Sequence, residues 1–258
     1  MKILIAMHKA YPVSKLAGYL PIQVGAELSD QALIQDCVPD NTGKNISRLN
    51  TYYNELTALY WAKYNLQDED IIGLVHYRRY FGNRASHDLN DVLTEETIRS
   101  TLKEVDVIVP KKRDYFIETQ EQHYLNAHAE LPYLTMKEVL AESYSEYSAT
   151  FDMIARSTKA HLFNMSIMRQ ADFQLYTDFL FGVLEEVAQR VDMTQYSGQD
   201  QRSLGFLAER LMDVWILTNN KTIREFPLVT TEKTNWLDKG TQFLLRKFLP
   251  NMKKRTHF

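Results

Sequence analysis

The sequence predicts one α/β domain that contains a helical insertion and ends in a short tail. Short apolar runs at residues 2–7, 71–75 and 105–109 have the length and near-continuous apolar character of strands buried on both faces of a sheet. Apolar and aromatic residues recur at helical spacing over 48–65 and 172–191. The 258-residue chain has only 7 prolines and 9 glycines, which argues against an all-β chain divided by many turns.

The remaining segments fill in this plan. Residues 10–47 show little periodicity and carry six prolines and glycines, so we expect a long ordered loop region, which in a compact domain is often functional. Further elements are expected as helices over 118–128, 136–142 and 151–155, a strand over 160–168, and a helix that follows 198–201 and ends near 217. We therefore assign residues 1–237 to the domain and 238–258 to the tail.

The charge of the chain is unevenly distributed. The formal net charge is −3, but residues 238–258 hold six basic residues against one acidic residue and sum to +5, which leaves −8 on residues 1–237. The body therefore offers no basic surface for nucleic acid. The tail mixes basic residues with Phe243, Leu244 and Phe248, so we expect it to lie on an anionic membrane or to form a solvated helix packed on the domain.

Cysteine content and hydropathy indicate the compartment. The single cysteine, Cys37, excludes an intramolecular disulfide and a cysteine-rich metal site. The apolar run at the amino terminus is too short for a signal peptide, and no stretch reaches the ~18 apolar residues of a membrane span. We expect a cytoplasmic protein that contacts the inner face of the cell membrane.

Basic residues follow two of the predicted strands. His76, Arg78 and Arg79 come directly after the strand at 71–75, and Lys111, with Lys112 and Arg113, follows the strand at 105–109. In open α/β sheets ligands bind outside the carboxyl ends of the strands, and guanidinium groups bind phosphate oxygens in a bidentate manner. We expect a diphosphate site here; the alternative is that these arginines pair with surface acids.

Several familiar sites are absent or misplaced. The polar segment 40–47 lacks the Gly-Lys-Ser/Thr order of a phosphate loop, and no dinucleotide-binding glycine pattern occurs. His123 and His128 lack the i, i+4 spacing of a helical zinc pair. Asp68-Glu69-Asp70 has the spelling of a metal-binding motif, but it precedes the strand at 71–75, so we expect a solvated loop at the opposite edge of the sheet.

Three residues are candidates for proton transfer. Asp200 and Glu209 are the first and second choices for a general base. Asp200 begins a helix, where a carboxylate is also favoured as a cap, and Glu209 lies one turn from Asp213 on a helix that can simply be a surface face. His161 lies in an apolar segment, where a hydrogen-bonded core histidine is the usual role.

Five strings in the sequence resemble a bacterial family that was first catalogued as a domain of unknown function and is associated with capsular or exopolysaccharide glycosyltransferases, including galactofuranosyltransferases. The strings are His8-Lys9, 40–47 (DNTGKNIS), 53–61 (YNELTALYW), 73–81 (GLVHYRRYF) and 161–165 (HLFNM). The resemblance extends from about residue 2 to 230. It implies a single nucleotide-sugar-binding domain of the GT-A type, with a mostly parallel central sheet flanked by helices and the donor at the strand carboxyl ends.

The resemblance also implies roles for individual residues. The nucleotide-sugar donor would contact a set of residues near the strand ends: His8, Lys9, Asp40, Asn41, Thr42, His76, Arg78, Arg79 and Lys111. The acceptor would lie near His161 and Asn164. GT-A folds usually place an Asp-x-Asp motif that binds Mn²⁺ or Mg²⁺ where this chain has 76–79. Either His76 or an unidentified acid holds a cation, or arginine charge replaces the cation.

The resulting hypothesis is transfer of a sugar, galactofuranose being one candidate, from a UDP-linked donor to a lipid-linked saccharide. Arg78, Arg79 and Lys111 would stabilise the leaving diphosphate, and Asp200 or Glu209 would deprotonate the acceptor hydroxyl. A non-catalytic module that binds a nucleotide sugar or phosphoglycan is the alternative, and a structural component of an assembly complex is a third.

Overall fold

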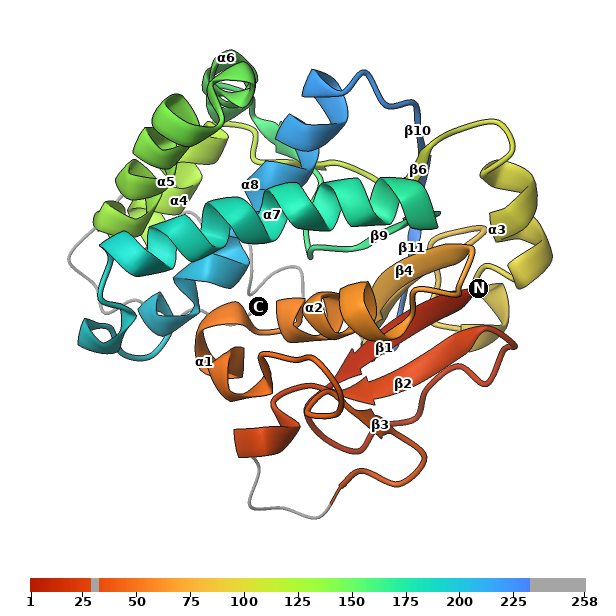
Figure 1. Ribbon diagram of the computed structural model, residues 1–258. Helices are drawn as coiled ribbons and strands as arrows, with labels where there is room; N and C mark the ends of the chain where they lie inside the picture. Colours follow the sequence, from red (N-terminus) through yellow and green to blue (C-terminus); the bar gives the residue numbers. More distant parts are fainter. Residues whose placement is uncertain (29–32, 233–258) are drawn as a thin grey trace.

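A central sheet organises the computed structural model, which describes residues 1–28 and 33–232. Its strands lie in the order β10-β6-β9-β4-β1-β2-β3, as Figure 1 shows. The strands are β1 (Lys2–Met7), β2 (Tyr19–Gln23), β3 (Val38–Pro39), β4 (Ile71–His76), β6 (Val107–Pro110), β9 (Ser166–Arg169) and β10 (Ile223–Phe226). A short hairpin extends β4 through β5 (Arg79–Phe81), which pairs with β11 (Leu228–Thr230).

The direction of the strands decides where a ligand can bind. β1 is parallel to β2 and β4, whereas β9 is antiparallel to both β4 and β6. Because two reversals restore the original direction, β4 and β6 point the same way, and the carboxyl ends of β1, β2, β4 and β6 lie at one edge. The prediction of a mostly parallel sheet flanked by helices is confirmed.

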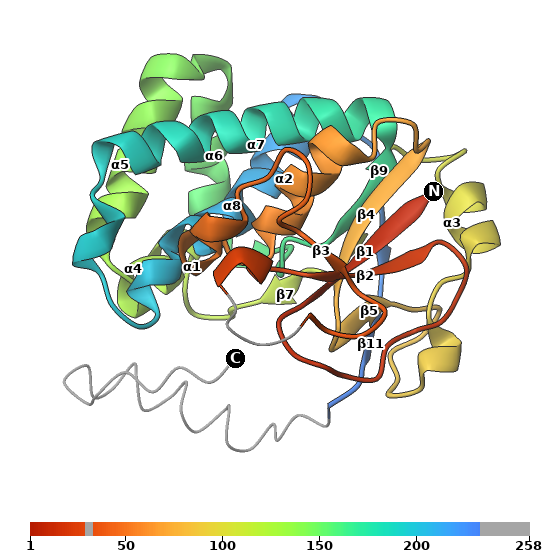
Figure 2. The same cartoon turned by 60° about the horizontal axis from the view of Figure 1, so that its bottom comes forward.

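Helices cover the sheet unequally. One face packs against a layer that includes α2 (Leu56–Asn65), α7 (Gln170–Arg190) and α8 (Ser203–Thr218), through core residues such as Leu4 and Leu74. The other face packs on α3 (Glu95–Thr101) and the β4–β5 hairpin, through residues such as Ile5. Figure 2 shows α7 and α2 on one side of the strands and α3 toward the other end.

The predicted helical insertion is present. It comprises α4 (Gln120–Ala127), α5 (Glu130–Ser143) and α6 (Ser145–Ala155), and it is bounded by the paired short strands β7 (Arg113–Asp114) and β8 (Lys159–Ala160). These helices gather at one end of the molecule in Figure 1. The insertion therefore forms a wall beyond the carboxyl edge of β6.

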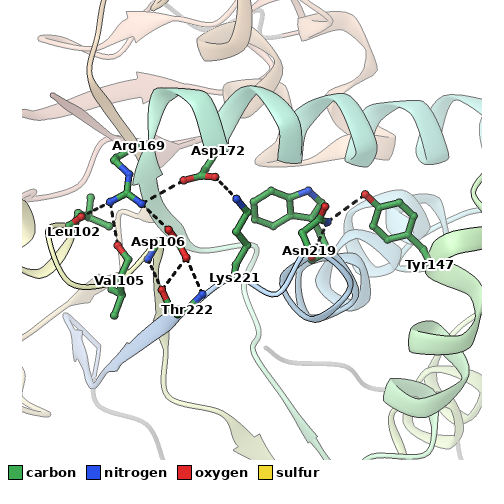
Figure 3. Close-up of polar contacts among 10 residues, drawn as sticks. Leu102, Val105, Asp106, Tyr147, Arg169, Asp172, Asn219, Lys221 and Thr222 are labelled. Atoms are coloured by element: carbon green, nitrogen blue, oxygen red, sulfur yellow. Dashed lines mark hydrogen bonds and ion pairs between the residues drawn. The ribbon is translucent and has the colours of Figure 1, made fainter.

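A polar network closes the opposite edge of the sheet, at the amino ends of β6 and β10 and the carboxyl end of β9 (Figure 3). Arg169 donates to Asp106 at 2.6 Å and to the Leu102 and Val105 carbonyls. Asp106 accepts hydrogen bonds from Thr222, and Lys221 donates to Asp172 at 2.7 Å. Both cations of this network, Arg169 and Lys221, have carboxylate partners, which marks the network as structural.

Three sequence predictions about elements were wrong in detail. The predicted loop at 10–47 contains β2 and β3, which Pro21 and Pro39 conceal because proline is rare in strands. The predicted helix at 48–65 is interrupted at Asn54, which has φ 51° and separates α1 (Asn50–Tyr53) from α2. The predicted strand at 160–168 is divided into β8 and β9 by a turn. The tail at 238–258 lies outside the described residues.

Among residues 1–28 and 33–232, no helix is long and apolar enough to span a membrane.

Candidate functional site

A cavity of about 350 Å³ opens at the carboxyl edge of the sheet. Residues that follow β1, β2, β4 and β6 form one side, and residues of α8 and the insertion form the other. The polar lining residues are His8, Asn50, Asn54, Glu55, His76, Tyr77, Arg78, Arg79, Arg113, Tyr115, His123, His128, Arg202, Glu209 and Arg210. Five arginines against two glutamates make this lining strongly cationic. Three of the five, Arg78, Arg79 and Arg113, belong to the basic clusters that follow strands in the sequence.

The tight turn between β4 and β5 presents two guanidinium groups to the cavity. The Arg78 side chain forms an ion pair with Glu232 at 3.0 Å. The Arg79 guanidinium lies over the ring of Phe163, 4.5 Å from its centroid, and forms no hydrogen bond or ion pair with any described residue. Burial lowers the pKa of Arg79, and the neighbouring Arg78 charge lowers it further. Arg79 is thus a partly buried cation that forms no ion pair with a carboxylate of residues 1–28 or 33–232.

A strained turn between β8 and β9 forms the cavity floor. Phe163 and Asn164 both have left-handed φ values, 74° and 53°. The Phe163 amide donates to Glu209 Oε1 at 2.9 Å, and its carbonyl accepts a hydrogen bond from His76 Nε2 at 2.7 Å. Asn164 donates to Glu55 Oε1 at 2.7 Å and to the Gly205 carbonyl at 3.0 Å. This turn therefore ties β4, α8 and the α1–α2 junction together around the cavity.

Glu209 is the carboxylate best suited to accept a proton. It lines the cavity from α8, where its Oε2 lies 3.3 Å from Arg210 Nη1. Burial raises the pKa of Glu209, although Arg210, the Phe163 amide and Arg79 act in the opposite direction, and the nearby Glu55 charge adds to the increase. A carboxylate with a raised pKa is a stronger base than a solvated one.

α8 approaches the α1–α2 junction closely because position 205 has no side chain. A Cβ at Gly205 would lie 2.4 Å from the Asn54 side-chain nitrogen. In the observed packing, Arg202 Nε donates to Asn54 Oδ1 at 2.8 Å. Gly205 thereby lets Glu55 of the α1–α2 junction and Glu209 of α8 share one cavity.

Aromatic pairs line the insertion side. Tyr115 stacks on His123 with ring centroids 4.0 Å apart, and His128 stacks on Phe206 at 4.1 Å. Burial lowers the pKa of His123 to about 4, although the hydrogen bond to Glu118 opposes this change. Arg210 is buried, and its Nε has no hydrogen-bond partner among the described residues. Planar rings beside a buried guanidinium suit a ligand with rings and negative charge.

The structure brings part of the predicted site together. His8, His76, Arg78, Arg79 and Glu209 line the cavity. The other predicted residues are absent from its lining: Lys9, Asp40, Asn41, Thr42, Lys111, His161, Asn164 and Asp200. Lys9 and Lys111 are exposed, Asn41 is exposed in a turn, and Thr42 accepts a hydrogen bond from Trp61.

Asp40 has a structural role that the sequence interpretation missed. Its side chain is fully buried and accepts hydrogen bonds from the Gly25 and Ala26 amides at 2.9 and 3.0 Å. Ser47 and Thr57 donate to the same carboxylate. With both oxygens engaged, Asp40 fixes the segment after β2 and is not available to a nucleotide.

His161, Asn164 and Asp200 also lie outside the cavity lining. His161 is buried between Asp213 and Glu225, with its Nε2 3.0 Å from Glu225 Oε1. Asn164 is buried beneath the cavity floor. Asp200 accepts a hydrogen bond from the Ala129 amide at 3.0 Å, so it joins α8 to the insertion. We therefore do not retain Asp200 as the first choice of base.

The sequence interpretation missed Glu55, Arg202 and Arg210. Glu55 lies within the 53–61 string that carries the family resemblance, and Arg210 adjoins Glu209, so both stood in segments already singled out. Neither spacing nor residue type distinguished the three residues from surface charges. For Glu55, the reason is that its place in the cavity depends on the break between α1 and α2 at Asn54.

The cavity offers few free carboxylate oxygens to a divalent cation such as Mn²⁺ or Mg²⁺, which binds several oxygen ligands. Its carboxylates are engaged by Asn164, the Phe163 amide and Arg210. Among the residues described, no group of three or more His, Cys, Asp or Glu side chains is placed to hold a metal. Asp70 lies at the amino end of β4, as predicted, and pairs with Arg99.

Comparison with known proteins places this geometry in a family. Residues 2–221 match the model described as domain of unknown function DUF4422. The chain belongs to the DUF4422 family. Its fold is similar to that of a solved structure titled "WbbM bifunctional glycosytransferase apo structure", with a TM-score of 0.80 and 26% sequence identity. The match covers 90% of this chain but 45% of that one, so this DUF4422 chain spans less than half of that protein. No curated protein matches the sequence.

Proposed function

We propose that this DUF4422 protein is a glycosyltransferase. It moves a sugar from a nucleoside diphosphate donor, which we take to be UDP-linked, to a lipid-linked saccharide. The observation that carries the proposal is the Arg79 guanidinium in the cavity at the strand carboxyl ends, which pairs with no carboxylate of the described residues. The similarity to a solved glycosyltransferase at 26% identity supports the same reaction class.

The contrast between the two edges of the sheet supports an anionic ligand. At the amino edge, Arg169 and Lys221 each have carboxylate partners. At the carboxyl edge, Arg79 loses hydration by burial and gains no counter-ion from the described chain. A partly desolvated charge without a partner costs folding free energy, and a bound diphosphate would supply the missing partner with bidentate hydrogen bonds.

Arg78 would complete the diphosphate site by exchanging partners. Its present partner, the Glu232 carboxylate, is half exposed. A donor diphosphate carries more negative charge than one carboxylate and can contact Arg78 and Arg79 together. We therefore assign both arginines to the leaving diphosphate, where they would stabilise the charge that develops in the transition state.

Glu209 is our proposed general base. In an inverting transfer, the acceptor hydroxyl oxygen forms a bond to the anomeric carbon while the bond from that carbon to the diphosphate oxygen breaks. Glu209 takes the hydroxyl proton, and the diphosphate leaves with the bonding electron pair. The hydrogen bond from the Phe163 amide holds Glu209 in place for this transfer. No metal ion takes part in these steps.

Glu55 provides a matched comparison within the same cavity. It also lines the cavity, but Asn164 donates to one of its oxygens. We expect it to orient the acceptor through its remaining oxygen. If Glu55→Gln abolished transfer and Glu209→Gln did not, the two roles would be reversed.

The finer identity of the substrates rests on family resemblance. Galactofuranose as the sugar, a capsular or exopolysaccharide acceptor, and a cytoplasmic location on the inner membrane face follow from that resemblance and from the basic tail at 238–258, which lies outside the described residues.

A thermal-shift screen tests the proposal. The full chain is incubated with UDP, GDP or CMP, each with and without Mn²⁺. We expect UDP to raise the melting temperature in the absence of metal, and we expect Arg79→Met to abolish the increase. No stabilisation by any nucleotide would contradict a donor site, and stabilisation only with Mn²⁺ would contradict the arginine-based diphosphate site.

A further inference from the structure

An exposed apolar tip lies beside the cavity. Phe116 and Ile117, which follow β7, are 80% and 49% exposed. Their neighbours Arg113 and Tyr115 line the cavity, so the tip stands at its mouth. Neither side chain belongs to the hydrophobic core of the described chain. A phenylalanine almost fully in water at the entrance of a cavity calls for a partner.

The backbone holds this tip in its exposed position. Phe116 has φ 59°, a left-handed conformation that is unfavourable for a bulky residue. Asp114 accepts a hydrogen bond from the Phe116 amide at 2.8 Å, and the Tyr115 carbonyl accepts one from the Ile117 amide at 2.7 Å. Since Tyr115 itself is buried, the chain is anchored on one side of the tip while Phe116 is directed outward.

Basic residues adjoin the apolar tip. Lys111, Lys112 and Arg113 are all exposed, and none forms an ion pair with a described residue. The nearby acids are already engaged: Asp114 lies 3.7 Å from Lys159, and Glu118 contacts His123. The segment thus combines uncompensated positive charge with projecting apolar groups.

We propose that residues 111–117, the mouth loop, insert Phe116 and Ile117 into an anionic lipid bilayer. The two apolar side chains enter the region between headgroups and acyl chains, and Lys111 and Lys112 contact anionic headgroups. This combination favours a membrane over a protein partner because exposed lysines are typically depleted from protein interfaces, whereas they attract anionic lipid.

The orientation that follows places the cavity mouth at the membrane surface. An acceptor anchored in that membrane would reach Glu209 without leaving the bilayer. This consequence rests on the proposed transferase function, but insertion of the mouth loop does not, so membrane binding can be measured without donor, acceptor or activity.

Depth-dependent quenching tests the proposal on the full chain. Phe116→Trp is compared with the matched control Leu175→Trp, because Leu175 is 57% exposed on α7, in a different part of the fold. Each variant is mixed with vesicles of phosphatidylglycerol and phosphatidylcholine that carry doxyl-labelled lipid, and the emission of the unsubstituted chain is subtracted. We expect quenching and a blue shift for Phe116→Trp only, and neither on pure phosphatidylcholine.

The same vesicles test the charges. Each basic residue near an anionic surface contributes about five-fold to binding. The double variant Lys111→Glu, Lys112→Glu should therefore weaken vesicle binding at least about 25-fold. The double variant Phe116→Ser, Ile117→Ser should also weaken it, and both variants should keep the circular dichroism spectrum of the wild type. The basic tail at 238–258 can also bind vesicles, so the quenching measurement decides which element inserts.

Two results would overturn the proposal. One is co-sedimentation of Phe116→Trp with anionic vesicles without doxyl quenching, because the membrane contact would then lie elsewhere. The other is a chain that does not bind the vesicles but self-associates in sedimentation velocity, if Phe116→Ser and Ile117→Ser together restore the monomer. That outcome would assign the tip to a protein interface.

Discussion

Replacing Arg79 by methionine separates ligand binding from folding. In the described chain, the Arg79 guanidinium forms no ion pair, and its direct contact is with the Phe163 ring. The longer-range attraction of Glu209, Glu232 and Glu55 is opposed by repulsion from Arg78. The contact with the ring is worth about 0.5–1 kcal/mol, and methionine keeps an apolar stem against the ring. Because removing an unpaired, partly buried charge also relieves a desolvation cost, we expect the free energy of unfolding to change by less than about 1 kcal/mol.

The effect on the donor should be much larger. Hydrogen bonds to a charged group contribute about 1.5–3 kcal/mol each, so losing a bidentate contact should weaken UDP binding by about 3 kcal/mol, a factor of about 150. Urea unfolding measures the stability, and isothermal titration with UDP measures the affinity. Arg190→Met is the control, since Arg190 is paired with Glu142 and Glu186 on the surface. Wild-type UDP affinity in Arg79→Met, or a large loss of stability, would refute the reasoning.

Three further predictions follow from individual polar groups. Asp40→Ala should lower the free energy of unfolding by about 4 kcal/mol in urea, since it leaves the buried Gly25 and Ala26 amides and the Ser47 hydroxyl without this acceptor, whereas Thr57 can still donate to the Asn54 carbonyl. A change below about 1 kcal/mol would contradict the structural role. Burial raises the pKa of Glu209, so transferase activity should be present above that pKa and lost as the pH falls through it. The acidic limb of the pH–activity profile should therefore lie above the usual pKa of glutamate, about 4.3. An acidic limb at that usual value would argue against Glu209 as the base. Burial lowers the pKa of His123 to about 4 in the folded chain, so between about pH 6.5 and 4 the unfolded chain binds a proton that the folded chain does not. The free energy of unfolding should therefore fall as the pH drops through this range. His123→Gln should flatten that decline in urea unfolding experiments, and an unchanged dependence of the free energy on pH would contradict the assignment.

Short-range patterns were sufficient to predict the edge of the sheet that carries the cavity. Apolar runs identified β1, β4 and β6, and the polar residues singled out after β4, which are His76, Arg78 and Arg79, line the cavity. A strand buried on both faces is easy to recognise from its continuous apolar run, and at its carboxyl end the chain turns toward solvent. The carboxyl-edge location therefore followed from the sequence.

Long-range contacts were not predictable in the same way. Asp40 looked like a nucleotide ligand because it stands among turn residues, but its four hydrogen-bond partners come from residues between 25 and 57 that only the fold assembles. The sequence ranked Asp200 above Glu209 as a base because the contact with the turn at Phe163, which holds Glu209 at the cavity, joins segments far apart in the chain. The break at Asn54 that presents Glu55 has no periodic signal.

The measurement that tests the central claim most directly is release of UDP by the purified full chain. UDP-sugars are supplied with a lipid-linked saccharide extract in the presence of a chelator, and the variant Glu209→Gln is assayed in parallel. Our account predicts acceptor-dependent UDP release by the wild type without added metal, and loss of that release in Glu209→Gln with UDP binding retained. No release from any UDP-sugar, or an active Glu209→Gln, would contradict it.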